Sequence, residues 1–157
     1  MMENKKEKYE LLCKQMEQLI AGETDEMAVF SNVAAALKEA FPQEFFWVGF
    51  YRVVDNELLL GPFQGSVACY HIGYGKGVCG TAWATGETQV VPDVEQFPGH
   101  IACSSLSRSE IVVPIFGVDG LVHGVIDIDS TELATFDMTD ACYLEKIAKI
   151  LAKQLQY

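Results

Sequence analysis

The chain has 157 residues, half of them hydrophobic and 21% charged, which is the size and apolar content of one compact domain with no room for a second. Its 22 acidic residues outnumber 11 basic ones, giving a formal net charge of −11, the wrong sign for binding a phosphate backbone or an anionic lipid surface. We therefore expect a single domain over residues 1–157, and neither nucleic acid nor a membrane as a partner.

The N-terminal segment and the cysteine count indicate the compartment. The segment MMENKKEKYE is charged where a secretory signal is apolar, and no apolar run approaches the roughly 20 residues of a membrane-spanning helix. We therefore expect a cytoplasmic protein. Five cysteines, an odd number in a reducing compartment, argue against a framework of structural disulfides. Any disulfide in this chain is expected to be transient and chemical.

Two helices are expected before any strand. Apolar residues repeat at helical spacing over about 5–21, and Gly22 supplies the stop expected just past a helix end. Thr24 or Asp25 can cap a second helix, whose apolar repeat ends before Pro42.

Aromatic and β-branched residues then indicate two β-hairpins. The first is FFWVGFYRVV (45–54), a turn at Asp55-Asn56 and ELLLGPF (57–63); the second is SEIVVPIFGV (109–118), a turn at Asp119-Gly120 and LVHGVIDID (121–129). About forty irregular residues separate the hairpins, with a short helix expected near 80–85 and a short strand near 88–91. A capped helix over about 138–156 closes the chain. This order predicts an α+β fold, a central antiparallel sheet flanked by helices.

The segment from Gly75 to Gly80 fits the dinucleotide-binding pattern G-x-G-x-x-G. That chemistry needs a parallel βαβ unit with an acidic residue about twenty positions further on. The neighbouring elements here are hairpins. We therefore interpret the glycines as allowing a tight loop with positive φ near a helix start, and not as a phosphate cradle.

The cysteines divide into two groups. Cys13 and Cys142 fall on predicted helices, where a small buried hydrophobic residue is the default interpretation. Cys69, Cys79 and Cys103 all fall in the irregular middle of the chain. Thiol redox chemistry needs one exposed nucleophilic cysteine and a second that can move onto its oxidised sulfur, and loop cysteines suit this.

A zinc site is the alternative for the loop cysteines. Three histidines could complete a ligand set with them: His71, His100 and His123. However, the chain has no C-x-x-C pair, and the spacings between the loop cysteines are ten and twenty-four residues. We therefore expect no metal ligands among them.

Three acids and two aromatic residues are candidates for a pocket. Asp127 and Asp129, two apart on a strand, share one face, and Glu110 lies on the other strand of the same hairpin. These acids either face solvent or line a pocket. Trp47 and Tyr51, four apart, also share a face and either pack in the core or wall an apolar pocket.

Four stretches together resemble the GAF-domain family of free methionine-(R)-sulfoxide reductases, in its three-cysteine subtype: FFWVGFYRV, LGPFQGSVACYHIGYGKGVCGTAW, VPDVEQFPGHIACSSLSRSEIVVPI and VIDIDS. The resemblance covers nearly the whole chain. It implies a GAF-like antiparallel sheet with N-terminal and C-terminal helices packed on it. It also implies an enzyme that reduces the free amino acid, needs no bound cofactor and commonly forms a homodimer.

The resemblance also implies roles for single residues. Cys103 matches the family's nucleophile and Cys69 its resolving partner, while Cys79 competes for either role. Trp47 and Tyr51 match an aromatic wall. The acids of the family pocket match Glu110, Asp127 and Asp129.

The residue types then predict a reaction. Cys103 attacks the sulfoxide sulfur while Glu110, with Asp129, protonates the oxygen, leaving methionine and a cysteine sulfenic acid. Asp127, or its neighbour, is expected to bind the substrate ammonium. Cys69 closes a disulfide that thioredoxin or a similar dithiol reopens.

Two other classes of function compete with the enzyme. GAF domains more often serve as small-molecule sensors, so the same pocket and cysteines can sense a ligand or an oxidant, although a sensor normally needs an output domain. A structural or interaction protein is the third interpretation. Nothing in that role requires thiols clustered with carboxylates.

Overall fold

The computed structural model describes residues 4–101 and 103–157; residues 1–3, which begin the charged N-terminal segment, and residue 102 lie outside the described part. Its helices are α1 (Lys5–Ile20), α2 (Glu26–Ala40), α3 (Gly77–Thr85) and α4 (Met138–Leu155), with a 3-10 helix at Val94–Gln96. Its strands are β1 (Trp47–Val54), β2 (Glu57–Gln64), β3 (His71–Ile72), β4 (Gln89–Val91), β5 (Ser109–Phe116) and β6 (Val122–Ser130).

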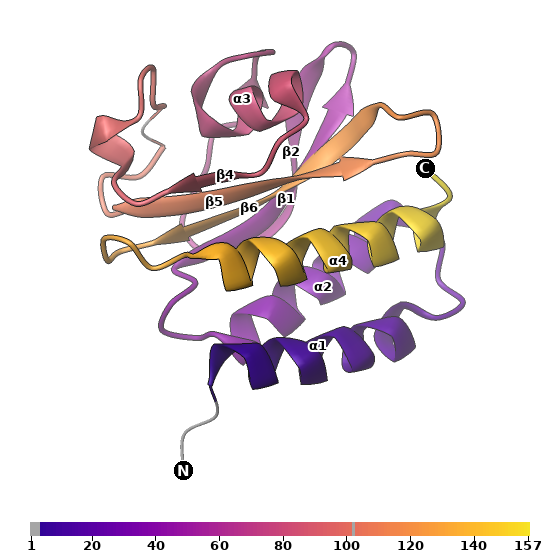
Figure 1. Ribbon diagram of the computed structural model, residues 1–157. Helices are drawn as coiled ribbons and strands as arrows, with labels where there is room; N and C mark the ends of the chain where they lie inside the picture. The colour runs from indigo at the N-terminus through magenta and orange to yellow at the C-terminus, as the bar shows by residue number, and fades with distance from the viewer. Residues whose placement is uncertain (1–3, 102) are drawn as a thin grey trace.

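All six strands form one antiparallel sheet in the order β3-β2-β1-β6-β5-β4. Helices α2 and α4 lie on one face of this sheet, α1 lies beneath them, and α3 lies on the opposite face with the irregular middle of the chain (Figure 1). The expected α+β fold, with N-terminal and C-terminal helices packed on an antiparallel sheet, is therefore confirmed.

Local sequence signals set most of the element boundaries. Asp25 caps α2 by accepting the backbone N–H of Ala28, so the cap is Asp25 and not Thr24. Asp137 caps α4 in a capping box with Asp140. Helix α3 begins at Gly77, three residues before the predicted start. That start was missed because the glycines at the beginning of the helix are themselves poor helix formers.

The two central hairpins fix the register of the sheet. Asp55 and Asn56 have φ of 51° and 63°, the left-handed pair that a two-residue hairpin turn requires, and they bring Val54 opposite Glu57. The hairpin β5–β6 has a wider turn and pairs Glu110 with Asp129. β1 then joins the hairpins by pairing with β6.

Each face of the sheet carries its own apolar core. The core under α2 and α4 holds strand residues such as Ile126 and Ile128 together with α1 side chains. The core on the opposite face is smaller and contains Trp47, Tyr51 and Cys79. Since side chains alternate along a strand, Asp127 points to the same face as this smaller core.

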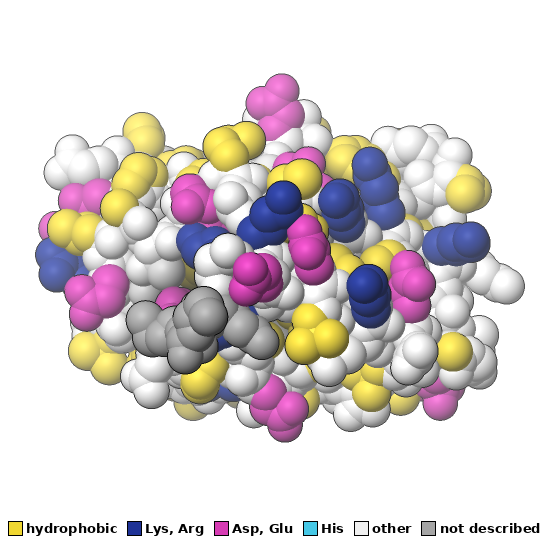
Figure 2. All heavy atoms as spheres, turned by 60° about the horizontal axis from the view of Figure 1, so that its bottom comes forward, with side chains coloured by type: hydrophobic (Ala, Val, Ile, Leu, Met, Phe, Trp, Pro, Cys, Tyr) yellow, Lys and Arg dark blue, Asp and Glu magenta, His cyan; other side chains and the backbone are white. Residues whose placement is uncertain are grey.

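The outer surfaces add two observations. The helix-covered side of the molecule mixes Lys and Arg with Asp and Glu side chains, so no single sign of charge dominates the face shown in Figure 2. Within residues 4–101 and 103–157, no helix combines the length and the apolar character that crossing a membrane requires.

Candidate active site

A cleft opens on the face of the sheet opposite α2 and α4. The space between its walls, counted with the open mouth, is about 570 Å³. Strands β1, β5 and β6 supply the floor, and α3 and residues of the segments 66–76, 100–101 and 103–107 supply the walls. Seven of the eight candidate residues line this cleft: Trp47, Tyr51, Cys79, Cys103, Glu110, Asp127 and Asp129.

Cross-strand register gathers the acids on the floor. Asp129 of β6 lies opposite Glu110 of β5 on one side and opposite Trp47 of β1 on the other. Asp127 lies opposite Gly49, two residues along the same strand. A Cβ at position 49 would come within 2.7 Å of the Trp47 indole, so glycine is needed there to let the ring lie over the strand.

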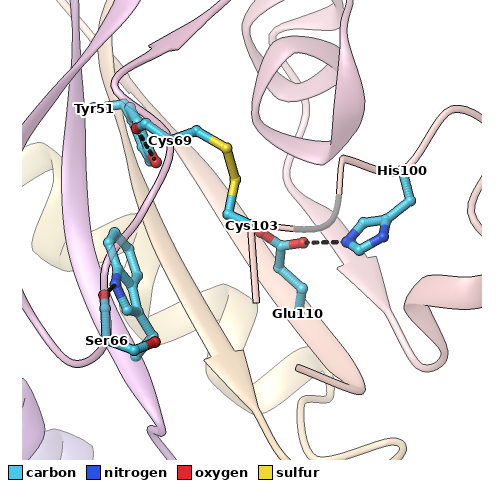
Figure 3. Close-up of a disulfide and its surroundings, with 7 residues drawn as sticks. Tyr51, Ser66, Cys69, His100, Cys103 and Glu110 are labelled. Carbon is cyan, nitrogen blue, oxygen red and sulfur yellow. Dashed lines mark hydrogen bonds and ion pairs between the residues drawn. A yellow bond between two sulfur atoms is a disulfide. The ribbon is translucent and has the colours of Figure 1, made fainter. Parts of the chain in front are cut away.

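Two hydrogen bonds hold the aromatic wall against the 65–70 segment. Trp47 Nε1 donates to the carbonyl oxygen of Ser66 at 2.9 Å, and the Tyr51 hydroxyl donates to the carbonyl oxygen of Cys69 at 2.9 Å (Figure 3). The indole also stacks on Phe63, with ring centroids 5.2 Å apart. The wall is therefore fixed by the same segment that carries Cys69.

Burial changes the protonation of the acids. Burial first, and then the charges of Asp127 and Asp129, raise the pKa of Glu110 well above its usual 4.5. Burial and the charge of Asp127 raise the pKa of Asp129 well above its usual 3.8. Burial also raises the pKa of Asp127 against the opposing effects of Glu110 and Cys79. The cluster therefore retains protons at pH values where exposed carboxyls have lost them.

Cys69 and Cys103 form a disulfide at the mouth of the cleft, with Cα atoms 5.7 Å apart and a separation of 34 positions in sequence (Figure 3). The disulfide links the wall segment held by Trp47 and Tyr51 to the segment that precedes β5. Cys103 lines the cleft, whereas Cys69, the eighth candidate, contributes no lining atoms.

Cys79 behaves differently from these two thiols. It is a free cysteine near the start of α3 and is only 4% exposed. Burial, and then the charges of Asp127 and Glu110, raise the pKa of its thiol well above the usual 9.0. Little thiolate is therefore present at this residue near neutral pH.

The expectations for the other cysteines and for the glycines have mixed outcomes. Cys13 is half-buried on α1, but Cys142 is exposed, so the expectation of a buried residue there is wrong. The apolar stripe of α4 passes through Leu144 and Ile147, and Cys142 lies outside it.

Gly75 and Gly77 have φ of 74° and 61°, as the tight-loop interpretation requires, and the described strands pair only in antiparallel fashion.

The histidines weighed as zinc ligands do not gather. His71 pairs with Glu57, and His123 pairs with Asp119. Only His100 enters the cleft, where its Nε2 lies 3.9 Å from Glu110 Oε1 (Figure 3). Burial lowers the pKa of His100, with Asp127 opposing.

Two lining residues, His100 and Ser107, were not predicted from the sequence to belong to the redox site. Their position in the sequence, close to Cys103, could have indicated that they belong to the site. Both residues lie within four residues of Cys103, on the segment that leads into β5.

The comparisons with known proteins agree with one another. A family profile described as a GAF domain matches residues 23–156. GAF domain-containing protein A of Dictyostelium discoideum is 56% identical over 149 residues, which cover 94% of this chain and 92% of that protein. The free methionine-R-sulfoxide reductase of Saccharomyces cerevisiae is 47% identical over 156 residues, covering 96% and 87%.

A solved structure gives the same assignment. The X-ray structure of free methionine-R-sulfoxide reductase from Neisseria meningitidis in complex with its substrate superposes with a TM-score of 0.94 and is 55% identical. The match covers 99% of this chain and 92% of that one. The chain therefore belongs to the GAF-domain family and, within it, to the free methionine-R-sulfoxide reductases.

Proposed function

We propose that the protein reduces free L-methionine-(R)-sulfoxide to L-methionine, with Cys103 as nucleophile, Cys69 as resolving cysteine, and thioredoxin or a similar dithiol as the final reductant. The observation that carries the proposal is the Cys69–Cys103 disulfide at the mouth of a cleft whose floor holds three acids. The relatives named as reductases of the same substrate support it.

The first step transfers oxygen from the substrate to a thiol. The Cys103 sulfur attacks the sulfoxide sulfur, and an acid gives its proton to the sulfoxide oxygen, which is a poor leaving group without one. The net products are methionine and the Cys103 sulfenic acid. The Cys69 thiol then displaces water from the sulfenic acid to close the disulfide, and a dithiol reduces it back to two thiols.

Glu110, with Asp129, is the proposed acid. The carboxyls are neighbours across the ladder, and the raised pKa of each favours the protonated form near neutral pH. Asp127 is proposed to bind the substrate ammonium from the next floor position. Trp47 and Tyr51 present an apolar surface for the S-methyl end of the substrate. Because the substrate is oriented between this surface and the acids, the site selects the R epimer.

Cys69 is preferred over Cys79 as the resolving residue for a geometric and a chemical reason. Its sulfur is bonded to Cys103, whereas Cys79 is buried with a raised thiol pKa beside the acids. A buried, protonated thiol is a weak nucleophile for a sulfenic acid formed at the cleft mouth.

The deciding experiment mixes the fully reduced protein with methionine-R-sulfoxide or, separately, with its S epimer, and adds no other reductant. Methionine released and thiols lost are counted per subunit. We expect about one methionine and about two thiols lost with the R epimer, and neither with the S epimer. Binding of the R epimer without methionine release would instead identify a sensor domain, and the absence of binding an interaction protein.

Two accompanying expectations are proposed with this function. The protein acts in the cytoplasm, where dithiol reductants are maintained, and it works as a single GAF domain in a homodimer. Light scattering of the purified protein measures the latter directly, since a monomer and a dimer of a 17.4 kDa chain differ twofold in mass.

A further inference from the structure

A thiol and two carboxylates meet among the buried residues that line the cleft. One ligand atom each from Cys79, Glu110 and Asp127 lies within 4.8 Å of the other two. These residues are 4%, 6% and 5% exposed. We propose that this cluster is a binding site for one thiophilic divalent cation of the Zn²⁺ class, and that the bound cation blocks reduction of the sulfoxide. The blocking step rests on the proposed function, whereas the binding step does not.

An unpartnered atom gives independent support for a ligand at this position. Oδ1 of Asp127 is buried and has no hydrogen-bond partner among the described residues. A buried carboxylate oxygen without a donor is costly, since most buried polar atoms are satisfied by protein or by a bound group. A cation held between Asp127, Glu110 and the Cys79 sulfur would satisfy that oxygen.

The fold holds the three ligands in place without a metal. Asp127 lies opposite Val112 on β5, and Glu110 is two residues from Val112, so both carboxylates project from neighbouring positions of one sheet face. Cys79 approaches them from α3, whose first turn is packed tightly: a Cβ at Gly80 would come within 2.5 Å of the Gly73 carbonyl oxygen. The backbone at each ligand is therefore fixed by the sheet or by a packed helix, and side-chain rotation is left to bring the ligand atoms to the metal.

The ligand types decide which cation fits. Sulfur with two carboxylate oxygens suits a four-coordinate Zn²⁺, and the fourth position is left to water or to His100, whose Nε2 lies 3.9 Å from Glu110 Oε1. Mg²⁺ and Ca²⁺ take six or more oxygen ligands, and this cluster offers too few. Binding displaces the protons held by the thiol and the carboxyls into solution.

Inhibition follows from the position of the cluster. A cation coordinated by Glu110 replaces the proton that this residue is proposed to give to the sulfoxide oxygen. It also neutralises Asp127, the proposed partner of the substrate ammonium. Substrate and cation therefore compete for the same carboxylates, and release of the metal restores activity.

The binding test uses the disulfide form, because Cys69 and Cys103 are then unavailable as ligands and the protein cannot turn over. Co²⁺ serves as the spectroscopic probe and Zn²⁺ as its competitor. We expect about one Co²⁺ per subunit with a thiolate-to-cobalt charge-transfer band, displaced by Zn²⁺ and unaffected by excess Mg²⁺. Cys79→Ser should abolish the band, and Asp127→Asn should weaken Zn²⁺ binding by at least about tenfold.

Two control variants separate this site from the other free thiols. Cys142→Ser and Cys13→Ser remove thiols on α4 and α1, outside the cleft, and should leave the band and the Zn²⁺ affinity unchanged. A band that survives in Cys79→Ser, or one that is lost in Cys142→Ser, overturns the site. Asp127→Asn keeps the test valid if Cys79→Ser does not fold.

Inhibition is measured separately on the fully reduced protein. Zn²⁺ should suppress single-turnover methionine release, and a chelator should restore it. Release that is unchanged with Zn²⁺ bound overturns the blocking step. Absence of release from metal-free protein contradicts the proposed function instead. The cation site is tested separately, by the spectrum of Co²⁺ in the disulfide form.

Discussion

Glu110 and Asp129 lie directly opposite each other on β5 and β6, with Trp47 next in the same row on β1. Two carboxylates opposed across a ladder repel, and their burial away from water adds to that cost. Retaining a proton relieves both effects. An arrangement that is unfavourable for two charged acids therefore favours the protonated form that the proposed proton donor needs.

Removing that donor should slow the chemical step without unfolding the protein. Glu110→Gln keeps the shape of the side chain and its burial but has no acidic proton, so single-turnover methionine release should fall by about 100-fold or more. Rapid-quench assays of the reduced protein measure this rate. Glu95→Gln, at an exposed position on the 3-10 helix, is the matched control and should behave as wild type. An unchanged rate in Glu110→Gln would assign the proton donor to another group.

The same cluster should make the stability of the fold depend on pH. The folded pKa values of Glu110 and Asp129 lie above their unfolded values. At pH values between the unfolded and the folded pKa, the folded state therefore binds more protons than the unfolded state. The free energy of unfolding should therefore fall as pH rises from about 4 through the raised values. Thermal unfolding of the disulfide form from about pH 5 to about pH 9 measures the slope.

Glu110→Gln is the variant that tests this dependence. It should flatten the slope and gain stability relative to wild type as pH rises, since the glutamine has no proton to lose. His100 acts in the opposite direction, because burial lowers its pKa and its protonation at low pH costs stability. The difference between variant and wild type is therefore the quantity to compare. Parallel curves would mean that Glu110 ionises normally in the folded state.

Cys103→Ser should abolish methionine release in a single turnover, because a serine hydroxyl is too weak a nucleophile to attack the sulfoxide sulfur. The assay is methionine formed per subunit with the R epimer and no added reductant. Cys142→Ser removes an exposed thiol outside the cleft and should release as much methionine as wild type. Full release by Cys103→Ser would assign the nucleophile to another cysteine.

Cys69→Ser should separate chemistry from recycling. The variant should still release about one methionine per subunit, because Cys103 is intact, and then stall under thioredoxin recycling, because no disulfide with Cys69 can form. Steady-state turnover with thioredoxin and its reductase measures the stall. Turnover equal to wild type would transfer the resolving role to Cys79.

Much of this fold can be predicted from local signals. The Asp55-Asn56 turn, the Asp25 cap and the alternation of Asp127 with Ile128 each depend on residues close together in sequence. For the same reason the shared face of Trp47 and Tyr51 is evident before the structure is known.

The long-range relationships cannot be read from the sequence. That Asp129 lies between Glu110 and Trp47 depends on the register of two strand pairs, and that register depends on packing of the whole sheet. Cys79 meets the acids because α3 crosses above β5 and β6, which its ten-residue spacing from Cys69 does not reveal. The Cys69–Cys103 pairing came from resemblance to a family, and it agrees with the disulfide found here.

Trp47 should determine substrate affinity more than the rate of chemistry. Its indole lines the cleft, beside the acids, and is held by its hydrogen bond to the Ser66 carbonyl oxygen. Trp47→Ala removes apolar contact with the bound substrate and should raise KM by about tenfold or more, with a smaller change in kcat. Trp47→Phe keeps an aromatic face, and its KM should lie between those of wild type and Trp47→Ala. Trp83, the other tryptophan of the chain, does not line the cleft, so Trp83→Phe is the control and should leave KM unchanged. A fall in kcat at constant KM in Trp47→Ala would instead show that the indole acts mainly in the transition state.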